Sequence, residues 1–447
     1  MTVRRKFIKQ MVAGGLLLPP VSRILLGQES KRNMSALNQS AIQEIRIALI
    51  GKGGMGTADT QTALSVEGVK LVAVCDLYDT RLEQARKQWG EHLFITKDYH
   101  EILKREDVDA VIIATPDHWH QPISIEAMKA GKHVYCEKPV IHKIKEGKAL
   151  IDAQQTSGVY FQPGSQGMAS LGNRKARQLV QTGIIGKINF IDGQFTGAPG
   201  ELGRYPIPED ASEETIWWKR FLGKAPWHTF DPQRFFYWRN WKDYGTGIAG
   251  DLYVHVLASL HFITGAIGPE KVYTTGGIRY YTDGYRDTPD VMLGYFDYPD
   301  RNNLGAFTVQ LGANYVDGIS RKWGSMDFRI VGSKGTIDIG WDKVTLKMLR
   351  SIDVRELEAL EKIGQGIDTP VQTSENEITF QADNNYRGGH YDHFYNFFSG
   401  IRNKSPLTAD VMFAVRSAAP ALLSYMSYER GEVIYWDPEN LKETKKK

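Results

Sequence analysis

The sequence predicts an α/β protein of two domains: a doubly wound parallel sheet, then an α+β domain with a largely antiparallel open sheet. Two observations carry this prediction. Apolar runs alternate with amphipathic stretches from residue 44 to about 165, and beyond that point apolar runs follow one another with few helices between them. The length of 447 residues allows two domains, and a content of 42% hydrophobic and 11% aromatic residues excludes a disordered chain.

In the first domain, residues 44–165, each apolar run is expected to be a strand and each amphipathic stretch a helix. The run 45–50 is rich in isoleucine, as is typical of a buried strand, and a glycine-rich loop begins directly after it. The further strands are expected at 69–75, 110–114, 133–136 and 159–162, and the helices at 57–65, 80–89, 98–104, 123–130 and 144–156.

The second domain, residues 166–447, is expected to contain a mixed or antiparallel sheet with helices packed on it. Its strands are expected at 188–194, 272–279, 291–298, 306–311, 327–331 and 335–340. Helices are expected at 174–182, 252–263, 390–402 and 409–429, and Pro420 is expected to kink the last of them.

Residues 1–30 are interpreted as an export signal. Arg4 and Arg5 precede an apolar residue at the spacing of a twin-arginine signal, and a modestly apolar stretch follows at 11–18. This stretch is too short to span a bilayer and is broken by Pro19-Pro20, so we expect no stable membrane span. A basic amphipathic arm is the alternative. Residues 31–43 are interpreted as a linker, and a periplasmic protein is expected.

Charge and cysteine content exclude two classes of protein. The formal net charge is only +3, and much of the positive charge lies in the N-terminal segment, so no basic face that would suggest nucleic acid remains. Cys75 and Cys136 are the only two cysteines, which excludes a disulfide framework.

A glycine-rich loop follows the first strand and opens a helix. Gly51, Gly53 and Gly56 fit the pattern G-x-G-x-x-G, with Gly54 and Met55 inside it. The first glycine permits a tight turn, the second lets backbone approach a pyrophosphate, and the third lets helix and strand pack closely. The start of the helix supplies N–H groups to the phosphates. The loop therefore predicts a dinucleotide-binding Rossmann domain, with a structural glycine turn as the alternative.

Asp76 ends the next expected strand, where its carboxylate can accept hydrogen bonds from the adenosine ribose hydroxyls. A 2′-phosphate would be repelled there, so NAD is the expected cofactor. Arg81 leaves NADP open as an alternative.

Two further segments leave the carboxyl ends of expected strands and would line the cofactor crevice. Thr115, Pro116 and His120 follow the strand at 110–114, and Glu137 and Lys138 follow the strand at 133–136. These residues are expected to contact the cofactor. Lys138, held by a proline turn, is also expected to donate to a substrate oxygen; a solvated loop lysine is the alternative.

These motifs resemble the Gfo/Idh/MocA family of NAD(P)-dependent sugar and inositol oxidoreductases. The resemblance rests on the glycine loop, Asp76, the Thr-Pro-x-x-x-His run at 115–120 and the sequence Glu137-Lys138-Pro139, and it covers about residues 44–437. It implies that residues 166–447 bind substrate and support oligomerisation, so a homo-oligomer is expected.

Asp251 and His255 lie four residues apart, on one face of an expected helix. They resemble the family's D-x-x-x-H pair. The resemblance implies that His255 is the general base for the substrate hydroxyl, that Asp251 binds substrate or orients the site, and that Lys138 stabilises charge on the same oxygen. A buried structural histidine is the alternative for His255.

Several residues are candidates for a sugar-binding surface. Sugar C–H faces stack on rings such as Trp238 and Tyr244, and Arg239 can bond hydroxyls, with Gln166 and Arg174 as further candidates. Packing between domains or subunits is the alternative. No metal is expected, because the chemistry needs none, although three residues of metal-ligand types occur together at His390, Asp392 and His393.

Residues and resemblance together predict an exported NAD-dependent oxidoreductase. It would oxidise a secondary hydroxyl of a sugar, glycoside or cyclitol, or reduce the ketone. Its cofactor should be tightly bound, because free NAD is scarce outside the cytoplasm. The alternative is an NAD-dependent glycoside hydrolase, like glycoside hydrolase family 109, acting by transient oxidation, elimination and re-reduction. A non-catalytic sugar-binding protein is the third hypothesis.

Overall fold

The computed structural model describes residues 44–196, 203–316, 327–357, 360 and 370–446. These residues belong to one compact unit that begins at Gln43. The interpreted export signal, residues 1–30, and the linker, residues 31–43, lie outside the described residues.

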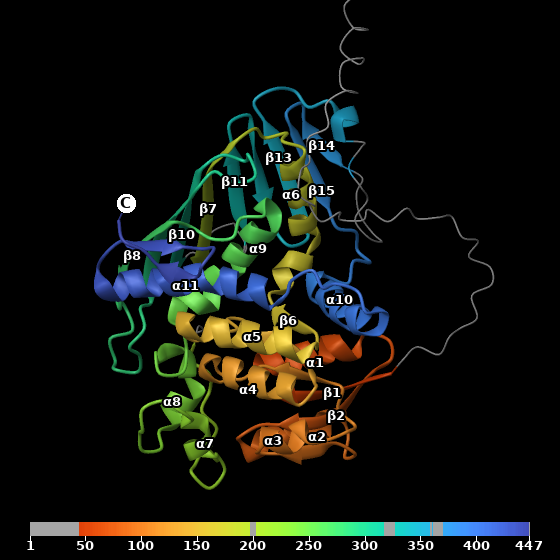
Figure 1. Ribbon diagram of the computed structural model, residues 1–447, viewed down its shortest axis with the longest axis vertical. Helices are drawn as coiled ribbons and strands as arrows, with labels where there is room; N and C mark the ends of the chain where they lie inside the picture. Colours follow the sequence, from red (N-terminus) through yellow and green to blue (C-terminus); the bar gives the residue numbers. More distant parts are fainter. Residues whose placement is uncertain (1–43, 197–202, 317–326, 358–359, 361–369, 447) are drawn as a thin grey trace, which may run out of the picture. The chain divides into compact units, whose positions relative to one another are not determined.

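The first sheet is a parallel Rossmann sheet, as predicted (Figure 1). Its strand order is β3-β2-β1-β4-β5-β6. Successive strands are added on one side of β1 up to β3 and on the other side from β4 onward, so the switch point lies between the parallel strands β1 and β4. A crevice opens at such a switch point, beyond the carboxyl ends of the strands. The strands are β1 (Ile45–Ile50), β2 (Val69–Cys75), β3 (Phe94–Thr96), β4 (Ala110–Ile113), β5 (His133–Glu137) and β6 (Phe161–Gly164).

Two apolar layers cover this sheet. Side chains alternate along β1, so that Ala48 and Ile50 face one core while Ile47 and Leu49 face the other. The first layer contains α3 (Tyr99–Leu103), α4 (Asp117–Lys129) and α5 (Gly147–Ser157). The second contains α1 (Gly54–Leu64), α2 (Asp79–Trp89) and, from the end of the chain, α10 (Gly389–Asn403). The C-terminal part of the chain therefore completes the first domain.

The start of α4 differs from the prediction. The sequence predicts a helix from residue 123, but α4 begins at Asp117 and contains Pro122. A proline usually marks a helix start or break, which is why the predicted helix began after it. As a result, His120 lies in the early turns of a helix that starts at the cofactor edge of the sheet.

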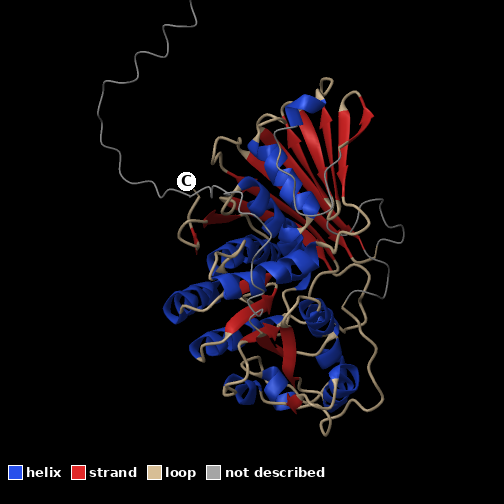
Figure 2. Cartoon of the chain, turned by 90° about the vertical axis from the view of Figure 1, so that its right-hand side faces the viewer, coloured by secondary structure: helices blue, strands red, loops and turns tan. Residues whose placement is uncertain are grey.

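The second sheet is mostly antiparallel and open, as predicted. Figure 2 shows its strands grouped at the top, with helices against one face. Its order is β14-β15-β13-β12-β11-β7-β10-β9-β8-β16-β17, and only the β7–β10 pair is parallel among the described pairings. The predicted strands correspond to β7 (Ile188–Thr196), β8 (Lys271–Gly277), β9 (Val291–Tyr298), β10 (Phe307–Asn314), β11 (Phe328–Gly332) and β12 (Gly335–Ile339).

Five strands of this sheet were not predicted, because they are short or carry polar residues on one face. They are β13 (Lys343–Met348), β14 (Val371–Ser374), β15 (Glu377–Gln381), β16 (Ile434–Asp437) and β17 (Lys442–Glu443). Three helices cover one face of the sheet: α6 (Leu171–Gln181), α9 (Val254–Thr264) and α11 (Val411–Arg430). None of the described helices combines the length and apolarity needed to cross a membrane.

Between β7 and α9 the chain makes a long excursion, residues 203–248, that we name the cap segment. It contains α7 (Trp218–Leu222), α8 (Pro232–Phe236) and the 3-10 turn η3 (Trp238–Asn240), which lie at the lower left of Figure 1. The sequence predicts only an irregular aromatic stretch here. The cap segment docks on the first domain through an antiparallel bridge between Ile216 and Tyr78 and a bond from Trp217 N to Leu77 O of 2.9 Å.

The predicted helix at 252–263 is two elements. A π-helical turn, η4 (Ala249–Tyr253), carries Asp251, and α9 follows it. The wider turn requires Gly250: a Cβ there would collide with the Thr246 side chain and lie 2.9 Å from Cγ of Pro139. Single π turns occur frequently at functional sites. Here the turn lets the segment of Lys138 and Pro139 approach Asp251.

Candidate active site

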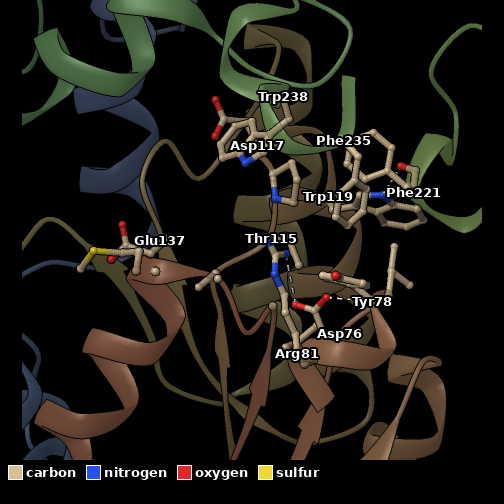
Figure 3. A pocket seen from close by; sticks show the side chains of 18 of the residues that line it. Asp76, Tyr78, Arg81, Thr115, Asp117, Trp119, Glu137, Phe221, Phe235 and Trp238 are labelled. Carbon is tan, nitrogen blue, oxygen red and sulfur yellow. Dashed lines mark hydrogen bonds and ion pairs between the residues drawn. The ribbon is translucent and has the colours of Figure 1, made fainter. Parts of the chain in front are cut away.

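A cavity of about 790 Å³ lies at the carboxyl ends of the parallel strands and is bounded by both domains and the cap segment. Figure 3 shows Asp76, Tyr78 and Arg81 together at one side and Glu137 at the other. Most predicted site residues line it: Gly51, Gly53, Gly54, Met55, Asp76, Thr115, Pro116, His120, Glu137, Lys138, Gln166, Trp238, Arg239, Asp251 and His255.

The three glycines of the loop have separate structural roles. Gly51 turns the chain at φ +100°, and a Cβ there would lie 2.6 Å from the carbonyl oxygen of Ala114. A Cβ at Gly56 would collide with the Gly51 carbonyl, so only glycine lets α1 pack this closely on β1. Around Gly53 nothing lies within 4 Å of a Cβ, which leaves the cavity side of the loop open for a pyrophosphate. Gly56 supports the loop without lining the cavity.

Asp76, the expected ribose contact, is held in a fixed position beside the cavity. Its carboxylate is almost fully buried and accepts hydrogen bonds from Lys52 N at 2.7 Å and Tyr78 N at 3.1 Å. Arg81 lies 3.6 Å from the same carboxylate, with its guanidinium 5.5 Å from the ring centre of Phe235. Asp76 and the aromatic side chain therefore hold Arg81, so that this cation is already paired with a carboxylate within the protein.

Thr115 and His120, two predicted cofactor contacts, differ in the hydrogen-bonding capacity that remains for a ligand. The Thr115 hydroxyl is buried and has no hydrogen-bond partner among the described residues, so it is available to a ligand. His120, in contrast, is 1% exposed, and its two ring nitrogens each lie 2.8 Å from a carbonyl oxygen, of Pro139 and Thr115. Burial lowers the pKa of His120 to about 4. Its ring braces the two cofactor-edge loops against each other.

Lys138 and Asp251 form the charged centre of the cavity. Lys138 Nζ donates to the Asp251 backbone carbonyl at 2.6 Å and to its carboxylate at 3.2 Å. Arg239 Nε donates to the same carboxylate oxygen at 3.2 Å. Burial would raise the pKa of Asp251, yet the two cations hold it well below its ordinary value. Asp251 is therefore ionised and positions both cations.

His255 lies one helical turn further along and also lines the cavity. Burial, followed by the positive charge of Lys138, lowers the pKa of His255 to about 3, and Asp251 opposes this shift. The imidazole is therefore neutral at neutral pH and can accept a proton. Its ring forms no hydrogen bond with the residues that the structure describes, so a ligand in the cavity can supply one.

Glu137 and Gln166 are joined by a hydrogen bond. Gln166 Nε2 donates to Glu137 Oε1 at 2.6 Å and to the Tyr135 hydroxyl at 2.9 Å. The amide protons of Gln166 are thus used within the protein, and Gln166, predicted to bind substrate, orients Glu137 at the cavity wall.

Two predicted substrate residues lie away from the cavity. Tyr244 is 0% exposed, and its ring packs 4.8 Å from that of Phe221 in the aromatic core of the cap segment. Arg174 lies on α6 and pairs with Asp392 at 3.5 Å. The sequence could not separate these residues from Trp238 and Arg239, because the folding of the cap segment decides which side chains face inward.

The histidines near the start of α10 do not share one site. His390 Nε2 lies 2.8 Å from Asp59 Oδ1, and His393 Nε2 lies 2.7 Å from the carbonyl oxygen of Pro163. Asp392 points to Arg174 instead.

Further residues line the cavity, and two of them, Asp117 and Trp119, belong to the run 114–120 that was expected to line the crevice. Asp117 is buried at the start of α4, accepts bonds from Thr246 N and Oγ1, and has its pKa raised to about 6 by burial. Tyr205 lines the cavity and receives a bond from Arg239 Nη1 at 3.0 Å. Aromatic and basic side chains of the cap segment and its neighbours complete the wall: Trp119, Arg220, Phe221, Phe235 and Phe236. For Arg220, Phe221, Phe235 and Phe236, the only sequence signal was the aromatic content of residues 217–244.

The cavity fits a dinucleotide on structural grounds. The loop at Gly53 is open, the Asp76 carboxylate is fixed by backbone donors, and the Thr115 hydroxyl has an unused bond. These residues would hold the pyrophosphate, the ribose and the middle of the cofactor. The first domain is accordingly an NAD-binding Rossmann domain.

Comparisons with known proteins agree with this assignment. The family described as "Oxidoreductase family, NAD-binding Rossmann fold" matches residues 45–165, and its "C-terminal alpha/beta domain" matches residues 223–434. Among solved structures, a levoglucosan dehydrogenase bound to NADH and levoglucosan has a TM-score of 0.65 at 18% identity, over 88% of this chain and 99% of that one. The aldose-aldose oxidoreductase of Caulobacter crescentus has a TM-score of 0.63 at 16% identity, over 88% and 100%.

Relatives of two kinds are similar in sequence. The 2,7-anhydro-N-acetylneuraminate hydratase of Mediterraneibacter gnavus is 23% identical over 67% of this chain and 68% of its own length. The α-N-acetylgalactosaminidase of Shewanella oneidensis is 29% identical over 34% of this chain and 37% of its own length. With both domains matched in order and the glycine loop, Lys138 and Asp251 in one cavity, the chain belongs to the Gfo/Idh/MocA oxidoreductase family.

Proposed function

We propose that the protein is an exported NAD-dependent oxidoreductase that oxidises a secondary hydroxyl of a sugar, glycoside or cyclitol, or reduces the matching ketone, with a tightly bound cofactor. One observation carries the proposal: Lys138, Asp251 and His255 share one cavity with a loop built for NAD. NAD supplies the hydride acceptor or donor when bound.

The side chains provide the proton chemistry. His255 is neutral, so its ring can take the proton of a substrate hydroxyl as the C–H bond breaks, or return it to a ketone oxygen in reverse. Lys138 is held by Asp251, so that its ammonium group can donate to the same oxygen and stabilise the negative charge that grows there. Asp251 stays ionised and prevents Lys138 from swinging away.

A sugar or cyclitol fits the remaining wall of the cavity. Trp238 offers a ring, and its neighbour Arg239 lies over that ring at 4.2 Å and donates to Tyr205 and Asp251. An apolar ring beside fixed polar groups suits a polyol, whose C–H and O–H groups point in different directions. The levoglucosan dehydrogenase and the aldose-aldose oxidoreductase also support a carbohydrate substrate.

Retention of the cofactor is supported by the cap segment. Asp210 accepts hydrogen bonds from the Tyr78 and Thr80 hydroxyls, and Arg220 donates to Asp98 at 3.1 Å. These bonds hold the cap segment over the Asp76 side of the cavity, where the adenosine would lie. A cofactor under such a cover leaves slowly, which suits an enzyme that works where free NAD is scarce.

An NAD-dependent glycoside hydrolase is the second candidate function. It is favoured by the similarity to the α-N-acetylgalactosaminidase and to glycosyl hydrolase family 109 proteins. The family 109 protein 2 of Shewanella sp. strain ANA-3 is 37% identical over 26% of this chain and 27% of its own length. In this reaction the ring hydroxyl would be oxidised, the aglycone eliminated, water added to the resulting double bond and the ketone reduced again. The same His255 and Lys138 would serve both outcomes.

One experiment separates these reactions. The purified protein, with its own nucleotide and no added NAD, is mixed with sugars and with aryl glycosides, and both the absorbance of the bound nicotinamide and phenol release are followed. The proposal expects a sugar-dependent redox change that disappears in His255→Asn while nucleotide content stays the same. Catalytic phenol release without net redox change would establish the hydrolase. No response to any sugar, in wild type as in the variant, would favour a non-catalytic protein.

Export has a separate test. Replacing Arg4 and Arg5 with lysines should leave the protein in the cytoplasm, whereas the unchanged chain should reach the periplasm when fractions are compared. Equal distribution of both proteins would contradict the export proposal. The homo-oligomer is supported by Tyr273, Leu293 and Tyr295, which are exposed on the open face of the second sheet, and sedimentation of the purified protein tests it.

A further inference from the structure

A buried acid pair lies behind the cavity wall, outside the proton chemistry described above. Asp59 on α1 is 0% exposed, and Glu137 at the end of β5 is 5% exposed. The two carboxyl groups influence each other, because the Asp59 carboxyl raises the pKa of Glu137. Two neighbouring buried carboxyls favour the state in which one of them holds a proton. The two residues come from different elements and together form a single titrating unit.

The surroundings of the pair are built for a shared proton. Asp59 Oδ2 has no hydrogen-bond donor among the described residues, so a proton shared with Glu137 satisfies an oxygen that is otherwise buried alone. Gln166 donates to Glu137 Oε1, and Gly164 leaves the space this oxygen occupies, because a Cβ there would collide with it. Burial and the Asp59 carboxyl raise the pKa of Glu137 to about 8, with Lys138 opposing them. Burial also raises the pKa of Asp59 well above its ordinary value.

The pair has one contact toward solvent. His390 Nε2 lies 2.8 Å from Asp59 Oδ1, and its side chain is 25% exposed. Burial lowers the pKa of His390, so the ring is neutral and can pass protons between water and Asp59. The other groups packed around the pair are uncharged Tyr135 and Cys136 beside Glu137, the His393 ring next to Tyr135, and the ammonium group of Lys138, which is bonded to Asp251.

We propose that Asp59 and Glu137 act as a charge compensator for the nicotinamide: the pair carries one negative charge beside NAD⁺ and takes up one proton when the cofactor is reduced to NADH. Glu137 lines the same cavity as Lys138 and His255. Figure 3 shows Glu137 on the opposite side from Asp76, where the adenosine ribose is expected. Oxidised nicotinamide is a cation and the reduced ring is neutral. The proton comes from water by way of His390, and no electron passes through the pair. Both acids are positioning residues.

The direction follows from electrostatics. An ionised pair attracts the cationic ring and loses that partner on reduction, so its proton affinity rises in the NADH form. Removing Glu137 should therefore favour NADH, and removing Asp59 should favour NAD⁺, because Glu137 ionises more readily without a second acid beside it. A purely structural role would shift both variants in the same direction.

The test uses the nucleotide-loaded protein and infrared difference spectroscopy. The bound cofactor is reduced chemically with dithionite, which needs no sugar substrate. The expected result is a new C=O stretching band of a buried carboxylic acid in the NADH form, absent in Glu137→Gln. Asp117→Asn is the matched control, since Asp117 is a second buried acid on the same cavity with a raised pKa, and the band should persist there. A wild type without the band, or loss of the band only in Asp117→Asn, would overturn the proposal.

A second measurement covers a variant that binds nucleotide poorly. The NADH-to-NAD⁺ affinity ratio is measured by competition at pH 7. It should rise roughly tenfold in Glu137→Gln and fall in Asp59→Asn, since a unit charge close to the ring in a partly buried site acts on this scale. Equal ratios in all three proteins would refute the inference. It rests on NAD binding alone, so a failed sugar screen leaves it standing, and its own failure leaves the proposed sugar chemistry untouched.

Discussion

Lys138 acts on the charge of two neighbours at once. Its ammonium group lowers the pKa of Asp251, and it adds to the effect of burial, which is the main cause of the low pKa of His255. Arg239 adds a second cation to Asp251 from the other side. The three charged groups therefore form a fixed arrangement in which Asp251 does not titrate at physiological pH and His255 stays neutral. A substitution at any of these positions changes the proton affinity of the others.

Replacing Lys138 with methionine should raise the pKa of His255 from about 3 toward its ordinary value, because the cation that disfavours imidazolium is gone while the Asp251 carboxylate remains. The ring titration can be followed by NMR with labelled histidine. Turnover should fall roughly 100- to 1,000-fold, the usual effect of removing one donor to a developing oxyanion. Lys132→Met is the control: Lys132 is also partly buried, but it bonds the carbonyls of Arg105 and Val108. An unchanged His255 titration in Lys138→Met would contradict this charge arrangement.

Local sequence signals predicted the individual helices and strands better than they predicted the contacts between them. The glycine loop, Asp76 and the parallel strands were predictable, because a tight turn after an apolar run depends on residues that are neighbours in the chain. The start of α4 and the π turn η4 were not predictable. Pro122 lies inside α4 and indicated a break in the helix. The π turn depends on the close approach of Gly250 to Pro139, which belongs to another part of the chain.

The second and third glycines of the G-x-G-x-x-G pattern, Gly53 and Gly56, allow cofactor binding and helix packing to be tested separately. Gly53→Ala should leave the unfolding free energy of the nucleotide-free protein nearly unchanged, since Gly53 has φ −82° and open space around a Cβ, but it should weaken NAD binding. Gly56→Ala should lower the unfolding free energy by about 1–3 kcal/mol, because its Cβ collides with the Gly51 carbonyl and separates α1 from β1. Denaturant unfolding and nucleotide titration of both variants provide the comparison. Similar unfolding losses in the two would refute the division of roles.

In the chain as a whole, the site is assembled from segments that lie far apart in the sequence. The acid pair and its solvent contact join Asp59, Glu137 and His390, and the cap segment brings Tyr205 and Phe236 to a cavity founded on the glycine loop. Such contacts carry no local signal. This is why the sequence placed Tyr244 and Arg174 beside Trp238 and Arg239 as substrate residues, although only the latter two face the cavity.

The cap segment leads to the final prediction, which concerns release of the cofactor. Phe236 is 4% exposed, lines the cavity, and packs edge-on against Tyr78 with ring centres 5.8 Å apart. Phe236→Ala should open the cap segment over the Asp76 side and speed NAD release at least roughly tenfold, since removing a buried phenylalanine costs several kcal/mol of packing. The rate is measured by exchange of the retained nucleotide against an excess of a fluorescent analogue. Phe230→Ala is the matched control, because Phe230 packs on Trp218 inside the same segment without lining the cavity. If both variants release NAD faster than wild type and at the same rate, general loosening of the cap segment explains the effect. If neither differs from wild type, the cap segment does not retain the cofactor.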